Sequence, residues 1–272
     1  MQSSILTTSS QIADVLSFIE GHTEFAFDTE TDGLSWDRRW IGFSFAVKIG
    51  DVYTGWYIPL YHEKGDDLFS PMPSNAPLEC ADKLIREIFK PTNKVWIHNA
   101  KFDLKVLRNE GYDVENLSCE ILDTVCVSWL LEPERMGGHG LKSLVPTILH
   151  KDMGSFEQFK LYKKNSYAPV GTMGKYAIDD AVLLLELAHA LYPCLSDQLK
   201  KVFHELEMPL VLIMEEVEHY GFRLDVETLK ELGITLKEKV DKIESEFKNM
   251  LRDYGSREGT VSDEDDWGYD EY

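Results

Sequence analysis

The sequence predicts an α/β domain with a mixed β-sheet flanked by helices, followed by a C-terminal helical extension. Three observations predict this fold class. Early segments are rich in aromatic and β-branched residues, the middle of the chain alternates short apolar runs with helical patterns, and the last part is almost wholly helical in pattern. With 272 residues, of which 43% are hydrophobic, the chain can bury the core that such a fold requires.

The first strands are predicted to form an antiparallel part of the sheet. Residues 24–30 alternate apolar with small or polar side chains, which is the period of two expected of a strand. Residues 40–47 and 52–59 are rich in aromatic and β-branched residues. Because only Ile49-Gly50-Asp51 and a neighbouring lysine separate these two runs, we expect them to pair as a hairpin.

Helices and short strands are predicted to alternate through the middle of the chain. Apolar residues three and four positions apart indicate amphipathic helices, and short apolar runs between them indicate strands. The expected helices are residues 76–90, 99–110, 124–131, 141–149 and 173–191, and the expected strands are residues 94–98 and 120–122. Proline and glycine interrupt the pattern at residues 132–138, as expected of a loop.

These patterns predict three parts of the chain. Residues 1–195 are expected to form the α/β domain, residues 196–255 a helical extension that breaks at Tyr220-Gly221-Phe222, and residues 256–272 an acidic, disordered tail. No apolar run approaches the ~20 residues of a membrane-spanning helix, and the N-terminus does not resemble a secretory signal. We therefore expect no membrane partner and a cytoplasmic location.

The formal net charge of −20 argues at first against a nucleic-acid partner, because phosphate binding normally requires a basic surface. However, a metal-dependent nuclease requires clustered carboxylates, and bound divalent cations reverse the local field. Much of the negative charge also lies in the tail at residues 262–272. The charge therefore does not exclude a nucleic-acid substrate.

Two pairs of polar residues lie at predicted ends of secondary structure. Asp28 and Glu30 are two apart at the end of a strand, so their side chains share one face. Asn99 and Asp103 are four apart across a helix start that follows a strand. Each pair alone has an ordinary structural explanation, because strand-end acids are often solvated and Asn99 could merely cap its helix.

A third pair, Tyr176 and Asp180, lies in the middle of an otherwise apolar helix, and its spacing of four places both side chains on one face. A tyrosine hydroxyl could orient a water molecule, although a packed ring with a satisfied hydroxyl is the ordinary explanation. Phosphodiester hydrolysis can use two divalent cations about 3.5–4 Å apart, which carboxylate oxygens would hold. Four acids in the three pairs would suffice for two Mg²⁺ ions, with Mn²⁺ as an alternative.

The order of these pairs along one α/β domain resembles a known superfamily. Residues 25–31, 98–103 and 176–181 are similar to the three exonuclease motifs of the ribonuclease H-like DEDD superfamily, in its tyrosine subclass. The chain further resembles the proofreading domains of family A DNA polymerases, the DNA polymerase I type, over roughly residues 20–250. Connecting elements and a passage into the polymerase domain carry this resemblance, at residues 123–124, 141–144, 205–210 and 218–225.

The resemblance implies a two-metal-ion 3′-5′ exonuclease that acts on the 3′ end of single-stranded DNA. It implies that Asp28, Glu30 and Asp180 bind one ion, and that Asp28 and Asp103 hold the second. It also implies that Tyr176 positions the nucleophile. For the DNA it implies a set of contacts to the last nucleotides: Thr31 near the 3′-hydroxyl, Leu34, Asn99 and Phe102 along the site, and Phe156 as a stacking aromatic.

Three interpretations of function follow. Trimming or proofreading of DNA ends is favoured over ribonuclease D-like trimming of RNA, because the passage at residues 205–225 resembles DNA polymerases. A non-catalytic scaffold of a split polymerase is disfavoured, since all four acids and the tyrosine are present. We expect no polymerase activity in this chain, because no palm or fingers follow Gly255. The chain would then be a truncated piece, a separate exonuclease, or a partner of a separate DNA polymerase polypeptide that docks on residues 196–255.

Overall fold

A six-stranded mixed sheet organises the fold, with its strands in the order β1-β4-β3-β2-β5-β6. The structure is a computed structural model that describes residues 2–33, 39–65 and 72–258. The strands are β1 (Ser4–Ile5), β2 (Glu24–Thr31), β3 (Trp40–Ile49), β4 (Val52–Pro59), β5 (Lys94–Ile97) and β6 (Glu120–Asp123). As predicted, β2, β3 and β4 pair antiparallel, and β5 and β6 then extend the sheet in parallel with β2. The C-terminal ends of β2, β5 and β6 therefore meet at one edge.

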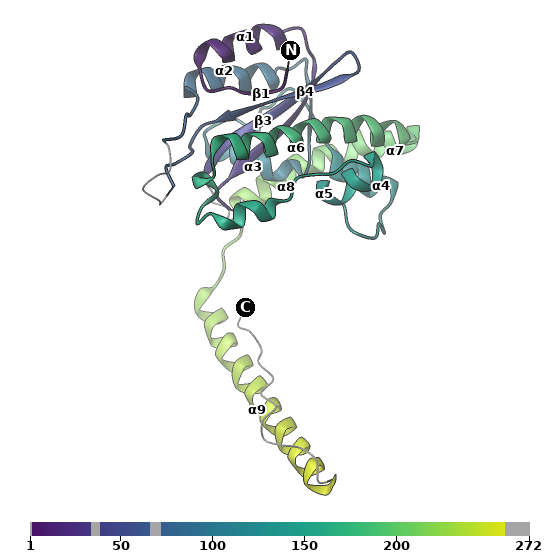
Figure 1. The fold of residues 1–272 in the computed structure, drawn as a ribbon. Coiled ribbons are helices and arrows are strands. Elements are labelled where there is room, and N and C mark those ends of the chain that lie inside the picture. The colour runs from purple at the N-terminus through teal and green to yellow at the C-terminus, as the bar shows by residue number, and fades with distance from the viewer. Residues whose placement is uncertain (1, 34–38, 66–71, 259–272) are drawn as a thin grey trace. The chain divides into compact units, whose positions relative to one another are not determined.

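Helices cover both faces of this sheet (Figure 1). The longer helices before the extension are α1 (Ser9–Ile19), α2 (Leu78–Ile88), α3 (Ala100–Asn109), α4 (Thr124–Leu131) and α6 (Val170–Leu191). Shorter ones are α5 (Leu141–Leu144), η1 (Val145–Leu149), η2 (Phe156–Leu161), η3 (Asn165–Tyr167) and η4 (Tyr192–Cys194). The helices and strands that the sequence predicts between residues 24 and 191 are present, with small differences at their ends.

Aromatic side chains fill the space between the sheet and the helix pair α1 and α2. The rings of Phe27 on β2 and Phe89 at the end of α2 meet edge-on, with centroids 5.0 Å apart. The ring of Phe18 on α1 lies 6.1 Å from that of Trp56 on β4. The sequence analysis did not predict α1 or β1. A capping box begins α1, since the Thr8 hydroxyl accepts a hydrogen bond from the backbone of Gln11.

The long helix α6 lies against the opposite face, and two glycines permit its close approach. A Cβ atom at Gly174 of α6 would lie 2.5 Å from the Ile5 side chain, and one at Gly55 of β4 would lie 2.9 Å from the Val182 side chain. Both distances are shorter than a normal carbon contact, so a larger residue at either position would push α6 away from the sheet. The two glycines therefore contribute to the short distance between α6 and the sheet.

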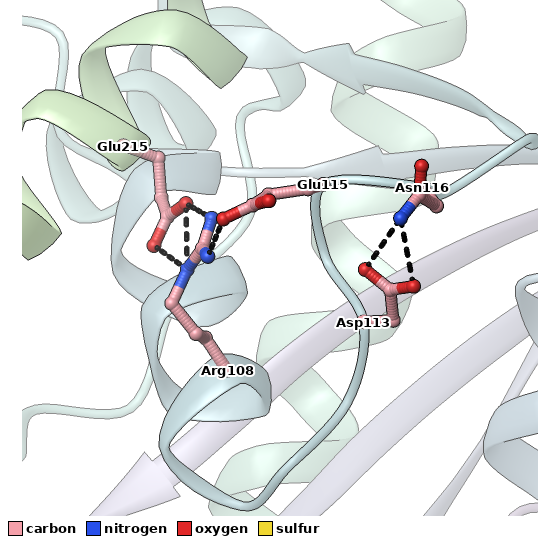
Figure 2. Close-up of polar contacts among 5 residues, drawn as sticks. All are labelled: Arg108, Asp113, Glu115, Asn116 and Glu215. Atoms are coloured by element: carbon pink, nitrogen blue, oxygen red, sulfur yellow. Dashed lines mark hydrogen bonds and ion pairs between the residues drawn. The ribbon is translucent and has the colours of Figure 1, made fainter.

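Three further helices, α7 (Asp197–Val202), η5 (Phe203–Glu207) and α8 (Met208–Tyr220), pack with the sheet domain. They belong to a compact unit that runs to Tyr220, because Phe203, Met208 and Val211 are buried. Figure 2 shows one polar contact of this packing: Arg108 of α3 donates to both carboxylate oxygens of Glu215 on α8, at 2.6 to 3.2 Å. The first part of the expected extension thus joins the α/β unit.

A second unit begins at Gly221, whose φ of 64° ends α8 at the predicted break. It contains α9 (Val226–Glu258), a single helix of 33 residues. Residues 259–272, most of the expected acidic tail, lie outside the described residues. Among the residues that the structure describes, no helix is long and apolar enough to cross a membrane.

Replacing Glu215 by glutamine is expected to lower the free energy of unfolding by about 3 kcal/mol, because it leaves the guanidinium of Arg108 largely buried without its main partner. Replacing Arg108 and Glu215 together by methionine is expected to restore most of this loss. Urea denaturation measures both effects. The control is Glu115→Gln, which removes the more exposed partner of the same arginine and is expected to cost less than about 1 kcal/mol. Equal losses from Glu215→Gln and Glu115→Gln would show that the pair does not hold α8.

Candidate active site

Three carboxylates converge where α6 crosses β2. Asp28 and Glu30 project from the same face of β2, and Asp180 reaches them from the middle of α6. Oxygen atoms of these three side chains all lie within 4.8 Å of one another. Asp28 is partly exposed, whereas Glu30 and Asp180 are buried. We call Asp28, Glu30 and Asp180 the carboxylate trio.

Asp103 lies outside the trio and is held by a neighbouring strand residue. Its Oδ1 atom accepts hydrogen bonds from the Thr29 backbone N–H at 2.8 Å and from the Thr29 hydroxyl at 2.6 Å. Its charge still reaches the trio, since it contributes to raising the pKa of both Asp28 and Glu30. The structure therefore brings three of the four expected acids together and places the fourth beside them.

Burial and mutual repulsion make the trio hard to ionise. Burial is the main cause that raises the pKa of Asp28 and Glu30 well above the usual range, and the charges of neighbouring carboxylates add to it. Burial likewise raises the pKa of Asp180 to about 7. Within the described residues, Glu30 Oε1 and Asp180 Oδ1 are buried without a hydrogen-bond partner. Unpartnered, closely spaced oxygens of this kind fit a hard divalent cation such as Mg²⁺ or Mn²⁺.

Tyr176 lies one helical turn before Asp180, and its ring is buried against Phe159, with centroids 5.1 Å apart. A hydrogen bond joins its hydroxyl to the Asp180 carboxylate. Burial, together with the nearby carboxylates, raises the pKa of Tyr176 above its usual value. The hydroxyl is thus protonated at neutral pH and oriented toward the trio.

A pocket of about 230 Å³ opens beside Glu30. Its lining includes three residues expected to contact the substrate, Thr31, Phe102 and Phe156. Thr29, Glu30, Gly33 and Asn165 complete the lining. Phe156 remains partly exposed, and its ring lies 6.2 Å from that of Tyr176. An apolar pocket that adjoins carboxylates can accommodate a base and sugar while a phosphate approaches the acids.

Two further expected substrate contacts, Leu34 and Asn99, stay predictions. Leu34 lies outside the described residues. Asn99 begins α3 in the left-handed conformation, with φ of 65°, and its side chain makes no capping hydrogen bond within the described chain. Asp123 at the end of β6 provides the cap instead, because its carboxylate accepts from the backbone N–H groups of Asn99 and Ala100 at 3.0 and 2.8 Å.

The sequence analysis missed two residues at this site. The Asn165 side chain donates to the Thr31 carbonyl oxygen at 2.9 Å, so it ties η3 to the end of β2. Lys142 of α5 donates to the Tyr176 hydroxyl, and its Nζ atom lies 4.4 Å from the centre of the Tyr176 ring. Both residues reach the site from short helices, α5 and η3, that lie far from β2 in the sequence, and a helical pattern does not indicate which distant element a side chain will meet. The one signal for Lys142 was that it lies within the motif at residues 141–144.

The chain matches a known protein family. A model of the family described as 3′-5′ exonuclease matches residues 3–196. The chain is 30% identical to DNA polymerase I of Synechocystis over 266 residues, which cover 90% of this chain and 24% of that protein. It is 26% identical to DNA polymerase I of Treponema pallidum, covering 83% of this chain and 25% of that protein. The chain thus spans about a quarter of the length of these relatives.

Solved structures share the ribonuclease H-like fold. The polymerase domain of Pol1 from M. smegmatis, solved with primer-template DNA, superimposes with a TM-score of 0.62 at 20% identity, covering 94% of this chain and 36% of that one. NrnC of Brucella melitensis, solved with Mg²⁺, gives 0.57 at 19% identity, covering 81% and 95%. RNase D of Escherichia coli gives 0.52 at 16% identity, covering 82% and 52%. The family match and the sequence relatives together show that the chain belongs to the 3′-5′ exonuclease family of the DNA polymerase I type.

Proposed function

We propose that this chain is a metal-dependent exonuclease that removes nucleotides from the 3′ end of single-stranded DNA, in trimming or proofreading. The observation that carries the proposal is the carboxylate trio, whose unpartnered oxygens adjoin a pocket of the size of a nucleotide base and sugar. The sequence relatives are DNA polymerases of bacteria and phages, which favours DNA as substrate and the cytoplasm of a bacterial or phage-infected cell as location.

Different residues of the chain have separate roles in the proposed hydrolysis. The trio and Asp103 would hold two divalent cations, which supply the Lewis acidity that phosphodiester hydrolysis needs at neutral pH. The Tyr176 hydroxyl would hold the attacking water in line with the phosphorus atom. Phe156 and Phe102 would stack on or pack against the last bases, each base contact contributing about 1–3 kcal/mol with little sequence preference. Thr31 at the pocket wall would meet the terminal 3′-hydroxyl.

RNA is the alternative substrate, and one observation favours it. The fold is shared with RNase D of Escherichia coli, which is described as an exoribonuclease involved in structured RNA processing. A scaffold without activity is the third candidate. The trio speaks against a scaffold, because burying like charges together destabilises a fold and has no evident structural use.

End-labelled single strands distinguish these candidates. With Mg²⁺, the pure chain is expected to shorten a 5′-labelled DNA strand one nucleotide at a time and to leave a 3′-phosphorylated strand largely intact, because the pocket admits a free terminus. The same RNA sequence is expected to react more slowly. Asp180→Ala serves as the inactive control. Cleavage of a circular single strand would contradict the exonuclease assignment, faster degradation of RNA would favour the alternative, and no degradation of either would support the scaffold.

Repulsion within the trio predicts that the metal-free protein gains stability when one charge is removed. Because the pKa of folded Asp180 is raised to about 7, the stability that its proton provides is complete below about pH 4 and lost as pH rises through about 7. At pH 8 in chelator, Asp180→Asn is therefore expected to unfold with a free energy about 1–3 kcal/mol higher than the wild type. At pH 4 the difference is expected to vanish.

Magnesium is expected to reverse this order, since a cation at about 100 times its Kd adds about 2.7 kcal/mol to the wild type and less to Asp180→Asn. Thermal melts at both pH values, with chelator and with Mg²⁺, measure these effects. The matched control is Asp179→Asn, which makes the same charge change at the adjacent, exposed position. If both variants melt alike in chelator at pH 8, the trio does not strain the fold.

We also propose a DNA polymerase polypeptide as the partner of α8. Exposed apolar residues recur every three or four positions along η5 and α8, at Leu206, Leu210, Ile213, Met214 and Val217. This stripe lies on the same helix whose Met208 and Val211 pack into the exonuclease unit. Since the polymerase relatives are about four times as long and their similarity continues through α8, a polymerase domain is the occupant that fits the stripe.

Gel filtration with light scattering tests this partner. The pure chain is expected to be monomeric, to co-elute with the DNA polymerase of the same organism, and to lose that association in Ile213→Asp while retaining nuclease activity. A dimer of the pure chain that Ile213→Asp dissociates would mean that a second copy covers the stripe instead.

A further inference from the structure

Lys142 occupies a position that the functions above do not explain. It belongs to α5, which η1, η2 and η3 separate from α6 in the sequence, yet its ammonium group donates to the Tyr176 hydroxyl. The same Nζ atom lies 4.4 Å from the centre of the Tyr176 ring and 5.7 Å from that of Phe156. The side chain is exposed, so a substrate can reach it. Lys142 therefore lies close both to the hydroxyl that would hold water and to the ring that would stack on a base.

The charges of the carboxylates and of the substrate indicate a role for Lys142. Lys142 is a cation whose field reaches the whole trio, because it opposes the rise in pKa of Asp28, Glu30 and Asp180. Two divalent cations would balance the four carboxylates, but a phosphodiester brings another negative charge, and more charge builds on its oxygens during hydrolysis. An additional positive group beside the phosphate would stabilise that charge.

We propose that Lys142 is a further catalytic residue, whose ammonium group binds a non-bridging oxygen of the scissile phosphate. The proposal rests on the exonuclease function proposed above. A nucleotide whose base stacks at Phe156 and whose phosphate faces the trio must pass the ammonium group, because Lys142 lies within 5.7 Å of the Phe156 ring centre and contacts Tyr176. Lys142 then exchanges its hydrogen bond to the Tyr176 hydroxyl for one to the phosphate. The released hydroxyl oxygen is free to accept a hydrogen bond from the attacking water.

The reaction balances without a proton from Lys142. The oxygen of water forms a bond to phosphorus as its proton passes to solvent, and the bond from phosphorus to the 3′-oxygen of the penultimate nucleotide breaks. That oxygen takes up a proton from solvent, and the products are a nucleoside 5′-monophosphate and a shortened strand. Lys142 stays protonated throughout and acts by charge and hydrogen bonding alone.

Two substitutions separate charge from shape at this position. Lys142→Met keeps the length of the side chain without its charge and is expected to lower the single-turnover rate on saturating single-stranded DNA on the order of 10²-fold. Lys142→Arg is expected to stay within about tenfold of the wild type, because the charge and donors remain. Lys175→Met is the control. It removes the same charge from the exposed side of α6, one residue before Tyr176, and is expected to leave the rate unchanged.

A binding measurement supplies a readout that does not depend on turnover. With Mg²⁺ present, calorimetry is expected to show that Lys142→Met weakens binding of thymidine 5′-monophosphate about tenfold, because one charge-assisted hydrogen bond is lost, and leaves binding of thymidine unchanged. Thermal melts with Mg²⁺ establish that each variant is folded.

Each outcome decides the proposal. A rate for Lys142→Met within threefold of the wild type would overturn it. So would unchanged binding of the monophosphate combined with an equally slow Lys142→Arg, since Lys142 would then serve only to hold Tyr176. If the wild type degraded neither DNA nor RNA, the proposed function would fail, whereas the comparison of thymidine with its monophosphate would still decide whether Lys142 binds phosphate.

Discussion

Crowding of three carboxylates between β2 and α6, two of them buried and the third partly exposed, is the constraint on which the rest of this structure depends. Like charges in a poorly solvated place repel one another, and the raised pKa values of Asp28, Glu30 and Asp180 express that cost. A flexible scaffold would relax by moving the acids apart or by admitting water. The rigidity of the sheet and of the helix that covers it must therefore resist this repulsion.

Packing on both faces of the sheet opposes the repulsion among the three carboxylates. Aromatic contacts hold the sheet against α1 and α2 on one face: Phe18 of α1 meets Trp56 of β4, and Phe27 of β2 meets Phe89 at the end of α2. On the other face, Gly55 and Gly174 allow α6 to pack closely on the sheet. Asp123 caps the start of α3, and Arg108 ties the same helix to Glu215 on α8 (Figure 2). Packing at several distant points thus offsets the repulsion within the carboxylate trio, and functional sites are commonly stabilised in this way.

The site also separates two kinds of recognition. The trio offers bare oxygens to cations, and the pocket beside Glu30 offers aromatic rings to a nucleotide. Rings recognise bases of any sequence, whereas carboxylates with cations recognise the phosphate that every nucleotide shares. A site built in this way suits an enzyme that must remove whichever nucleotide lies at a strand end. Lys142 links the two regions, since its ammonium group is close to Tyr176 and Phe156 alike.

Local patterns in the sequence determined the strands at residues 24–59, the alternating helices and strands that follow, and the faces on which Asp28, Glu30, Tyr176 and Asp180 lie, because periodicity fixes side-chain direction within one element. Periodicity does not report which elements meet. Four features are therefore properties of the tertiary structure. They are the pairing of β1 with the sheet, the hydrogen bond from Thr29 to Asp103, the packing of α8 beyond residue 195, and the hydrogen bond from Lys142 to Tyr176. Each is a contact between residues far apart in the chain, which only the complete packing of the domain brings together.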